Sequence, residues 1–498
     1  MSLVCSLPLF MIIGGLLTGA VCLLLRGPGA FRLVCLLVLF QTAADAVVLR
    51  YTRQNGVFTY SMGEFSAPWG NEIRAGVLEC TVLLVFLLVL LSSVIAGYRY
   101  LKTDIDESKH QLYFALIGLL SSALCSLLFT NDIFSGYVFL EIMTLACCGL
   151  LAVREVGRTT LAAVRYMIMN LLGSGLFLLG VILIYNITGH LLMVPIQGAV
   201  AEIAADPYMM PSLTFAVGIM TIGLAIKSGL FPFHFWMPDT YGYGTPTTAA
   251  VMSSIVSKSY IFLLIKIYWR AVGTDILAKM PIGQILLILG MAGVVFGSLS
   301  ALRANNLNRM IAFSSAAQIG YIFMSLGIGG TPGCTAAILH MLGHSVTKSL
   351  LFLSSPHLAD VSGNSLVFRN LEGSALRDHA AGLFTLCGAL SMVGIPAFAG
   401  FSSEFLISLA AADTHHGRIL FPVVTILAIS TVLNALYFLR TVIRIYTRPK
   451  KADISTAKAG IQPDFLIPGV ILTVLNLFLG LAPFLTAGLL EKGLHMFS

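Results

Sequence analysis

Several ionisable side chains lie in the middle of long apolar stretches, where a membrane would surround them. A charged side chain at the centre of a bilayer costs at least a few kcal/mol, so such residues usually mark an ion or proton path. A buried lysine can exchange its proton when a nearby carboxylate approaches or leaves, and histidine titrates near neutral pH without help. We therefore predict a proton relay, joined by water, that includes Glu141, Lys227, Lys258, His344, Lys348 and Glu404.

The spacing of these residues favours one connected path. Glu141 close to Lys227 would form an ion pair whose breaking changes the proton affinity of the lysine. Lys258 follows Pro246 by a stretch of about 18 Å of helix, which brings it close to the bilayer midplane. His344 and Lys348 are one helical turn apart, so they share a face of their helix.

Three further basic residues have a structural interpretation beside a functional one. His340 lies one turn before His344 and fits a packed histidine as well as a relay residue. His234 either belongs to the relay or anchors its stretch of chain at the membrane interface. Lys266 lies near a helix end, and we expect its ammonium group to reach the membrane surface by snorkelling.

Two of the apolar stretches are interrupted, at Pro232 and at Gly394-Ile395-Pro396. Proline removes a backbone donor and frees a carbonyl about one turn earlier, and free backbone groups in a bilayer must face protein or a water-filled cavity. The two breaks are five helices apart, which suits two five-helix repeats with inverted topology, a known pointer to a transport site. Simple proline kinks are the alternative interpretation.

The composition restricts the protein to a membrane. Of its 498 residues, 57% are hydrophobic and 10% are charged, and its mean hydropathy is +0.92. A soluble domain carries about 25% charged residues. These values exclude an ordinary soluble protein, a disordered chain and a nucleic-acid binder, and the net charge of +7 is interpreted as loop charge that orients the protein.

The apolar stretches predict an all-α, polytopic membrane protein with about fourteen spans, because a span needs roughly 20 apolar residues. Strands are not expected, since the stretches are too long and do not alternate. The first stretch has no basic region before it and is expected to be a retained helix. The spans are predicted near residues 4–25, 30–49, 77–97, 112–130, 132–152, 160–187, 211–231, 246–269, 283–302, 307–328, 333–354, 381–410, 420–443 and 465–490.

Four segments follow from this count. We expect an N-terminal three-helix segment at 1–110 and a first five-helix repeat at 111–270. The second, inverted repeat covers 271–446, and a cytoplasmic loop with the last helix covers 447–498.

The positive-inside rule orients the chain with both termini outside, because basic residues gather in the loops after odd-numbered spans. A solvated cytoplasmic loop is the favoured interpretation of the Lys450-Lys451 pair, with a lipid or partner contact as the alternative. The loops after odd spans contain Arg26, Arg32, Arg99, Lys102, Lys109, Arg154, Arg158, Arg303, Arg369, Arg377, Arg444, Arg448, Lys450, Lys451 and Lys458. The loops after even spans contain Arg50, Arg53, Arg74, Arg270, Lys279 and Arg418.

No cofactor or metal site is expected in this chain. Its nine cysteines form no CxxC pair, no Cys/His group has metal-ligand spacing, and most cysteines sit inside apolar stretches. Neither GxGxxG after a strand pattern nor GxxxxGK[ST] occurs, so nucleotide chemistry is not expected.

Several motifs resemble the antiporter-like, proton-translocating membrane subunits of respiratory complex I, membrane-bound hydrogenases, formate hydrogenlyases and Mrp-type sodium/proton antiporters. The resemblance covers most of the chain from about 110 to 445, and the combination of motifs is more specific than any one of them. The motifs are Lys227-Ser228-Gly229 with Phe231–Asp239, Pro246 to Lys258, Asn308–Ser315, His344–Lys348, and Gly394–Phe401 leading to Glu404.

The resemblance implies a role for the same residues. In the family, the matching glutamate and lysine of the fifth and seventh helices form a pair, and the later basic residues continue a hydrophilic axis along the membrane midplane. This chain departs from the pattern at Met252, where many members have a histidine, and at Thr240–Thr245, which replaces an Ala-rich loop. Its fifth, tenth and eleventh helices look closest to the hydrogenase and Mrp D-like branch.

The resemblance also implies the setting. Such a protein moves protons, or Na⁺ against protons, within a larger complex in a prokaryotic inner membrane, and the redox chemistry would take place in partner subunits. The alternatives are a stand-alone secondary transporter of an organic solute, with a substrate-sized pocket at the broken helices, and a structural membrane scaffold whose buried charges are merely paired.

Overall fold

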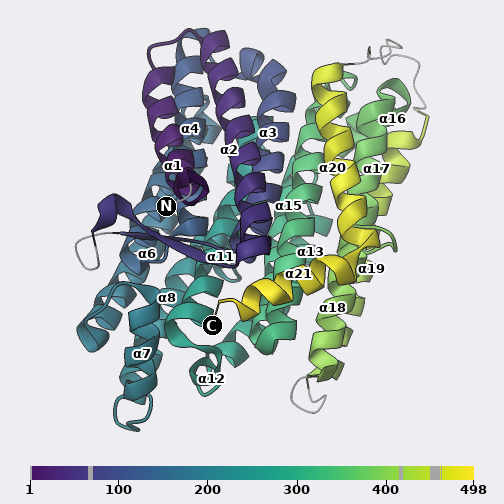
Figure 1. Ribbon diagram of the computed structural model, residues 1–498. Helices are drawn as coiled ribbons and strands as arrows, with labels where there is room; N and C mark the ends of the chain where they lie inside the picture. Colours follow the sequence, from purple (N-terminus) through teal and green to yellow (C-terminus); the bar gives the residue numbers. More distant parts are fainter. Residues whose placement is uncertain (1–2, 66–70, 414–418, 449–459, 461, 498) are drawn as a thin grey trace.

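The computed structural model of the protein describes residues 3–65, 71–413, 419–448, 460 and 462–497. Figure 1 shows a bundle in which most of the long helices run roughly alongside one another. Four basic residues of the orientation argument lie outside the described residues: Arg418, Lys450, Lys451 and Lys458.

The first part of the chain, up to Phe129, contains four long helices and a short antiparallel hairpin, and the hairpin was not predicted from the sequence. The hairpin pairs Phe58 with Ala75 and Ser61 with Glu72, and it lies across the helices in Figure 1. The elements are α1 (Leu3–Cys22), α2 (Gly27–Asn55), β1 (Phe58–Ser61), η1 (Met62–Glu64), β2 (Glu72–Ala75), α3 (Val77–Asp104), η2 (Glu107–Lys109) and α4 (His110–Phe129).

The middle of the chain contains a broken helix followed by a continuous span with two π-helical segments. The elements are α5 (Ile133–Ala152), α6 (Gly157–Thr188), α7 (Met193–Ile203), α8 (Met210–Ser228), η3 (Phe233–Trp236), α9 (Met237–Tyr243), α10 (Pro246–Val251), η4 (Met252–Val256), α11 (Ser257–Lys266) and η5 (Ile267–Val272).

The last part contains the second broken helix, formed by α17 and α18. The elements are α12 (Thr274–Leu277), α13 (Ile282–Leu302), α14 (Leu307–Ile328), α15 (Gly330–Asp360), η6 (Phe368–Leu371), α16 (Ser374–Arg377), α17 (His379–Val393), α18 (Ala399–Asp413), α19 (Leu420–Tyr446), α20 (Pro463–Leu481) and α21 (Pro483–His495).

The polytopic, all-α prediction is confirmed, apart from the small hairpin. Within the described residues, 13 helices are long and apolar enough to cross a membrane. The broken pair α17–α18 supplies the remaining predicted span, because each half is too short to be counted alone. The predicted last span at 465–490 is wrong at its end: α20 stops at Leu481, and α21 is a separate helix that crosses the bundle at an angle (Figure 1).

The two breaks have the same backbone geometry. Gly229 ends α8 with φ 79° and ψ 36°, and Gly394 ends α17 with φ 81° and ψ 39°, a left-handed conformation that glycine adopts at little cost. In both, the amide after the glycine donates to the carbonyl five residues before it. These bonds join Leu230 to Ala225 at 3.0 Å and Ile395 to Leu390 at 3.1 Å.

The prolines therefore follow the helix ends and do not create them. Pro232 and Pro396 lie beyond the glycines that close each helix. The matching breaks are what two related repeats would produce, while the segment boundaries at 110, 270 and 446 stay a prediction.

Burial distinguishes the central helices from the peripheral ones. The apolar windows of the span Pro246–Val272 and of α15 are fully buried, whereas only 28% of the α19 window is buried. Lys258, His344 and Lys348 lie on the two fully buried spans, so protein surrounds them on every side.

Candidate proton pathway

Glu141 and Lys227 form the predicted ion pair. Glu141 lies on α5 and Lys227 in the last turn of α8, and the distance from Lys227 Nζ to Glu141 Oε1 is 3.2 Å. The lysine side chain is fully buried, while 24% of the glutamate side chain is exposed. The lysine of the pair is thus enclosed by protein, whereas part of the glutamate side chain reaches the surface of the protein.

Polar groups of neighbouring helices complete the shell of Lys227. Its ammonium donates to Thr144 Oγ1 at 2.8 Å, to Ser174 Oγ at 2.5 Å and to the Asn170 carbonyl at 3.4 Å. Ser174 also donates to Glu141 Oε1, so its hydroxyl bridges the acid and the base. A buried charge needs such partners, and these hydroxyls keep Lys227 bonded if the glutamate moves.

A close helix crossing makes room for the lysine. A Cβ at Gly173 on α6 would lie 2.8 Å from the Gly223 carbonyl of α8 and 2.8 Å from Lys227 Cγ. Glycine is needed at Gly173 because α6 and α8 touch there and the stem of Lys227 fills the remaining space.

Lys258 lies just after the π-helical segment η4. Its ammonium donates to the Ser253 carbonyl and contacts Ser257 Oγ at 3.4 Å. A π-helical turn disturbs the regular i→i−4 ladder, and such turns often occur at functional sites. Among the described residues, no carboxylate pairs with Lys258, which makes it a base held by dipoles alone.

Lys258 is the centre of a group of basic residues. It lies close enough to His340, His344 and Lys348 to interact electrostatically with each of them. Lys348 donates to the Ile311 carbonyl at 3.0 Å and also to Ser314 Oγ. Because like charges repel at this range, the group cannot easily carry all its protons together, which favours passing one along.

The two histidines extend the series from Lys258 toward α18. Both rings are buried, with 6.3 Å between their centroids. His340 shares a hydrogen bond of 2.8 Å between its Nδ1 and Ser403 Oγ of α18. Neither ring nitrogen of His344 has a protein partner among the described residues, so both can bond water.

Glu404 closes the series at the second broken helix. Its Oε2 packs against Gly394, where a Cβ would lie only 2.8 Å away. Tyr321 connects it to the histidines, because its ring stacks on His340 with 5.0 Å between centroids and its hydroxyl lies beside the Glu404 carboxyl. The acid therefore sits directly at the break, as Lys227 does at the first one.

Aromatic hydroxyls occupy the interval between Lys227 and Lys258. The centroid of the Tyr260 ring lies 5.4 Å from Lys227 Nζ, and its hydroxyl is 3.2 Å from Thr144 Oγ1. Tyr241 lies beside Ser257, which in turn contacts Lys258. Tyr260 thus lies beside Lys227 and Tyr241 beside Ser257, while a continuous path between the two lysines stays a prediction.

Comparisons with known proteins identify the family. A family described as NADH:quinone oxidoreductase/Mrp antiporter, transmembrane, matches residues 130–430. The N-type subunit of the NADH-quinone oxidoreductase of Desulforudis audaxviator is 31% identical over 425 residues, which cover 84% of this chain and 82% of that protein. The chain belongs to this family.

Other members and solved structures agree with this family fold. The D-type subunit of the Na⁺/H⁺ antiporter of Alkalihalophilus pseudofirmus is 28% identical over 72% of this chain and 70% of its own length. A chain of an archaeal membrane-bound sulfane sulfur reductase superposes with a TM-score of 0.85 at 24% identity, covering 99% of this chain and 97% of its own. A chain of the Mrp complex from Dietzia sp. superposes with a TM-score of 0.87 at 23% identity and the same coverage. Since relatives of both kinds match at similar identity, these values do not favour the Mrp D-like branch over the complex I branch.

The structure also shows the surroundings of His234 and Lys266, two basic residues outside the six proposed for the relay. His234 is half-buried and its ring lies 5.6 Å from that of Phe231, which places it at the break without tying it to the relay. The snorkelling interpretation of Lys266 is wrong. Its side chain is fully buried, and its ammonium donates to the carbonyls of Leu128, at 2.7 Å, and of Thr130 at the end of α4.

Sequence reasoning missed a second set of buried charges in the N-terminal part of the protein. Arg74 forms a buried ion pair with Glu79, and Asp45 in α2 is fully buried beside Cys80. The acid inside the apolar stretch 30–49 was the available signal for Asp45. The hydroxyls of Thr144 and Ser174 gave no signal, because single Ser and Thr residues are common in membrane helices.

Proposed function

We propose that this multi-pass membrane protein translocates protons as a subunit of a larger membrane complex. The observation that carries the proposal is the Lys227 ammonium, fully buried and held at 3.2 Å by a partly exposed glutamate. At that distance the pair is worth about 5 kcal/mol at an effective dielectric constant of about 20. A change in the position or protonation of Glu141 would therefore change strongly how firmly Lys227 holds its proton.

A translocation step follows from this geometry. With Glu141 paired, Lys227 stays protonated. When the pair opens, the proton moves toward Lys258 through water and the hydroxyls of Thr144 and Tyr260. From Lys258, repulsion by the neighbouring basic groups favours transfer along the histidines to Glu404.

The partners, location and energy source belong to the same proposal. The sulfane sulfur reductase and Mrp structures are membrane complexes, which supports other membrane subunits as partners of this chain. We propose a prokaryotic inner membrane with both termini outside, protons as the moved ion with Na⁺ as the counter-ion if the complex is an antiporter, and redox cofactors confined to the partners.

The family match does not favour the solute-transporter alternative, because the matched relatives are subunits of quinone oxidoreductases and of Na⁺/H⁺ antiporters. That alternative requires a substrate-sized cavity between the broken helices. A cavity of about 890 Å³ lies instead at the helix ends, where Arg99, Asp104 and Arg154 line it together with the loop after α9.

Replacing Lys227 tests the proposal. In the assembled complex reconstituted into vesicles, Lys227→Ala should remove most proton pumping while the subunits still assemble, because the relay loses its first base. Lys279→Ala is the matched control, since Lys279 is an exposed lysine in the loop before α13. Normal pumping by the assembled Lys227→Ala complex would exclude Lys227 from the mechanism.

A further inference from the structure

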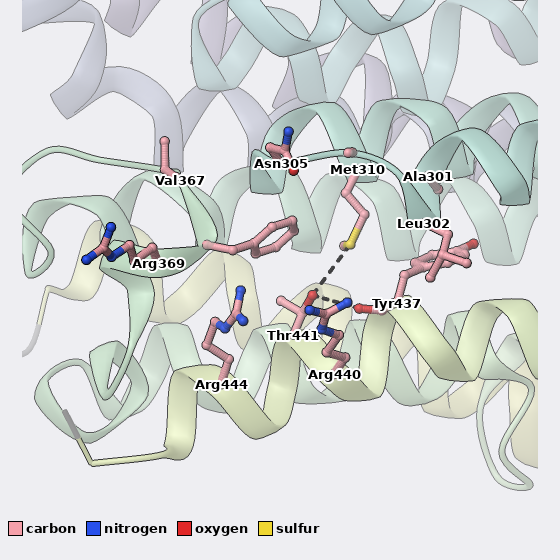
Figure 2. Close-up of a pocket in the computed structure, with 12 residues that line it drawn as sticks. Ala301, Leu302, Asn305, Met310, Val367, Arg369, Tyr437, Arg440, Thr441 and Arg444 are labelled. Atoms are coloured by element: carbon pink, nitrogen blue, oxygen red, sulfur yellow. Dashed lines mark hydrogen bonds between the residues drawn. The ribbon is translucent and has the colours of Figure 1, made fainter. Parts of the chain in front are cut away.

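A cavity of about 300 Å³ opens between the ends of α13, α14 and α19 and the segment around η6. Figure 2 shows Arg440 and Arg444 rising from α19 toward this space, with Asn305 on the opposite wall and Arg369 at the outer edge. The cavity lies on the side of the membrane that the basic loops assign to the cytoplasm. None of the residues proposed for the proton relay lines it.

The charge of this cavity is uncompensated within the described chain. Arg440 and Arg444 are one turn apart on the same face of α19, so their guanidinium groups serve one space. Among the described residues, no carboxylate lines the cavity and none forms an ion pair with Arg369, Arg440 or Arg444. The planar donors of arginine match the oxygens of a phosphate group better than those of any neutral ligand.

The rest of α19 is apolar and exposed. Val432, Leu436 and Ile443 are 60%, 52% and 67% exposed, and Val432, Leu436 and Arg440 follow one another at four-residue spacing. They form a stripe that runs along the helix toward the arginines. An acyl chain lying on this stripe would bring its headgroup to the arginine cavity at the membrane surface.

We propose that this cavity binds the phosphate headgroup of an anionic phospholipid, with Arg440 and Arg444 as the phosphate donors and the exposed stripe of α19 as the acyl-chain contact. Charge complementarity supports the anionic headgroup, and the continuity of cavity and apolar stripe supports a lipid over a soluble anion. Basic pockets between membrane helices at the cytoplasmic surface are known to hold such headgroups. The cavity volume is at the small end of ligand pockets, which fits a headgroup.

The proposal is tested by lipid binding to the intact complex that contains this chain. The complex is stripped of lipid in detergent, and native mass spectrometry then follows titration with phosphatidylglycerol, with phosphatidylcholine and with inorganic phosphate in separate arms. We expect phosphatidylglycerol to bind and the double variant R440Q/R444Q to bind it about thirtyfold more weakly, because two phosphate contacts are lost. The single variant R440Q, which alters only an exposed side chain, should weaken binding about fivefold and serves if the double variant does not assemble.

The matched control is R26Q/R32Q, which removes two exposed arginines on the same predicted side and should leave binding unchanged. Equal binding of phosphatidylglycerol to the wild type and the R440Q/R444Q complex would overturn the proposal. Binding of phosphatidylcholine as tightly as phosphatidylglycerol would also overturn it, because the site would then not recognise the negative charge of the headgroup. Binding of inorganic phosphate as tightly as phosphatidylglycerol would overturn the lipid as the occupant and leave an anion site.

Discussion

The replacement Glu141→Gln tests the switchable ion pair, because it removes the charge of the acid while keeping its size and its contact with Ser174. The distance of 3.2 Å corresponds to about 5 kcal/mol of attraction at an effective dielectric constant of about 20. Lys227 keeps its hydrogen bonds to Thr144 and Ser174 when the acid loses its charge, so we take about half of this value, about 2.5 kcal/mol. At about 1.36 kcal/mol per factor of ten, proton pumping should fall about seventyfold.

The assay is proton uptake by vesicles that contain the assembled complex, driven by its own substrate. Glu202→Gln, an exposed acid on α7, is the control and should pump normally. A double-mutant cycle with Lys227→Ala completes the test, since residues that act as a pair give non-additive effects. If Glu141→Gln pumped within about twofold of wild type, or if its effect simply added to that of Lys227→Ala, the pair would not be the switch.

Two further predictions concern the packing that supports the site. Gly173→Ala should lower the stability of the complex by about 1–3 kcal/mol, because the added methyl group meets the Gly223 carbonyl and Lys227 Cγ at 2.8 Å. Gly175→Ala is the control, since the space around Gly175 is open. Equal melting temperatures of the two variants would contradict the close crossing of α6 and α8. Asp378→Ala should cost about 1 kcal/mol, because Asp378 Oδ1 accepts the Ala381 amide at 2.9 Å and caps α17. Burial alone would raise the pKa of Asp378, but hydrogen bonds from His357 and Ala381 outweigh it and lower the pKa below its usual range. The stabilisation is therefore present above about pH 4 and is lost as the pH falls through the lowered pKa; thermal melts at about pH 7 that show no loss for the variant would contradict the capping role.

The features that could be predicted from the sequence are those in which burying a polar or charged group in the membrane costs free energy. Spans of about 20 apolar residues are visible because the bilayer demands them, and the Glu141–Lys227 pair was predictable because an unpaired charge at mid-membrane is expensive. The breaks were predicted from Pro232 and from Gly394-Ile395-Pro396, although Gly229 and Gly394 are the residues that end the helices. The spans and the breaks depend on hydropathy and local backbone preference.

Other features depend on three-dimensional contacts that leave no trace in the pattern. Thr144 and Ser174 bond Lys227 only because α5, α6 and α8 pack together, and their hydroxyls hardly change the hydropathy. Lys266 was misinterpreted because a lysine near a helix end usually reaches water, whereas here the end of α4 offers two carbonyls to its ammonium. α21 continues the apolar pattern of α20 across Ala482, so only the structure separates them.

We propose that the buried basic and acidic residues form one proton path through the protein. We would replace Lys258 by methionine (Lys258→Met) in the assembled complex, because the proposed path runs from the first ion pair through Lys258 to the histidines. Among the described residues Lys258 has no carboxylate partner that the change would leave unpaired. We expect this variant to assemble and to keep the partner chemistry but to lose proton translocation. Proton translocation at the wild-type rate in this variant would contradict the proposal.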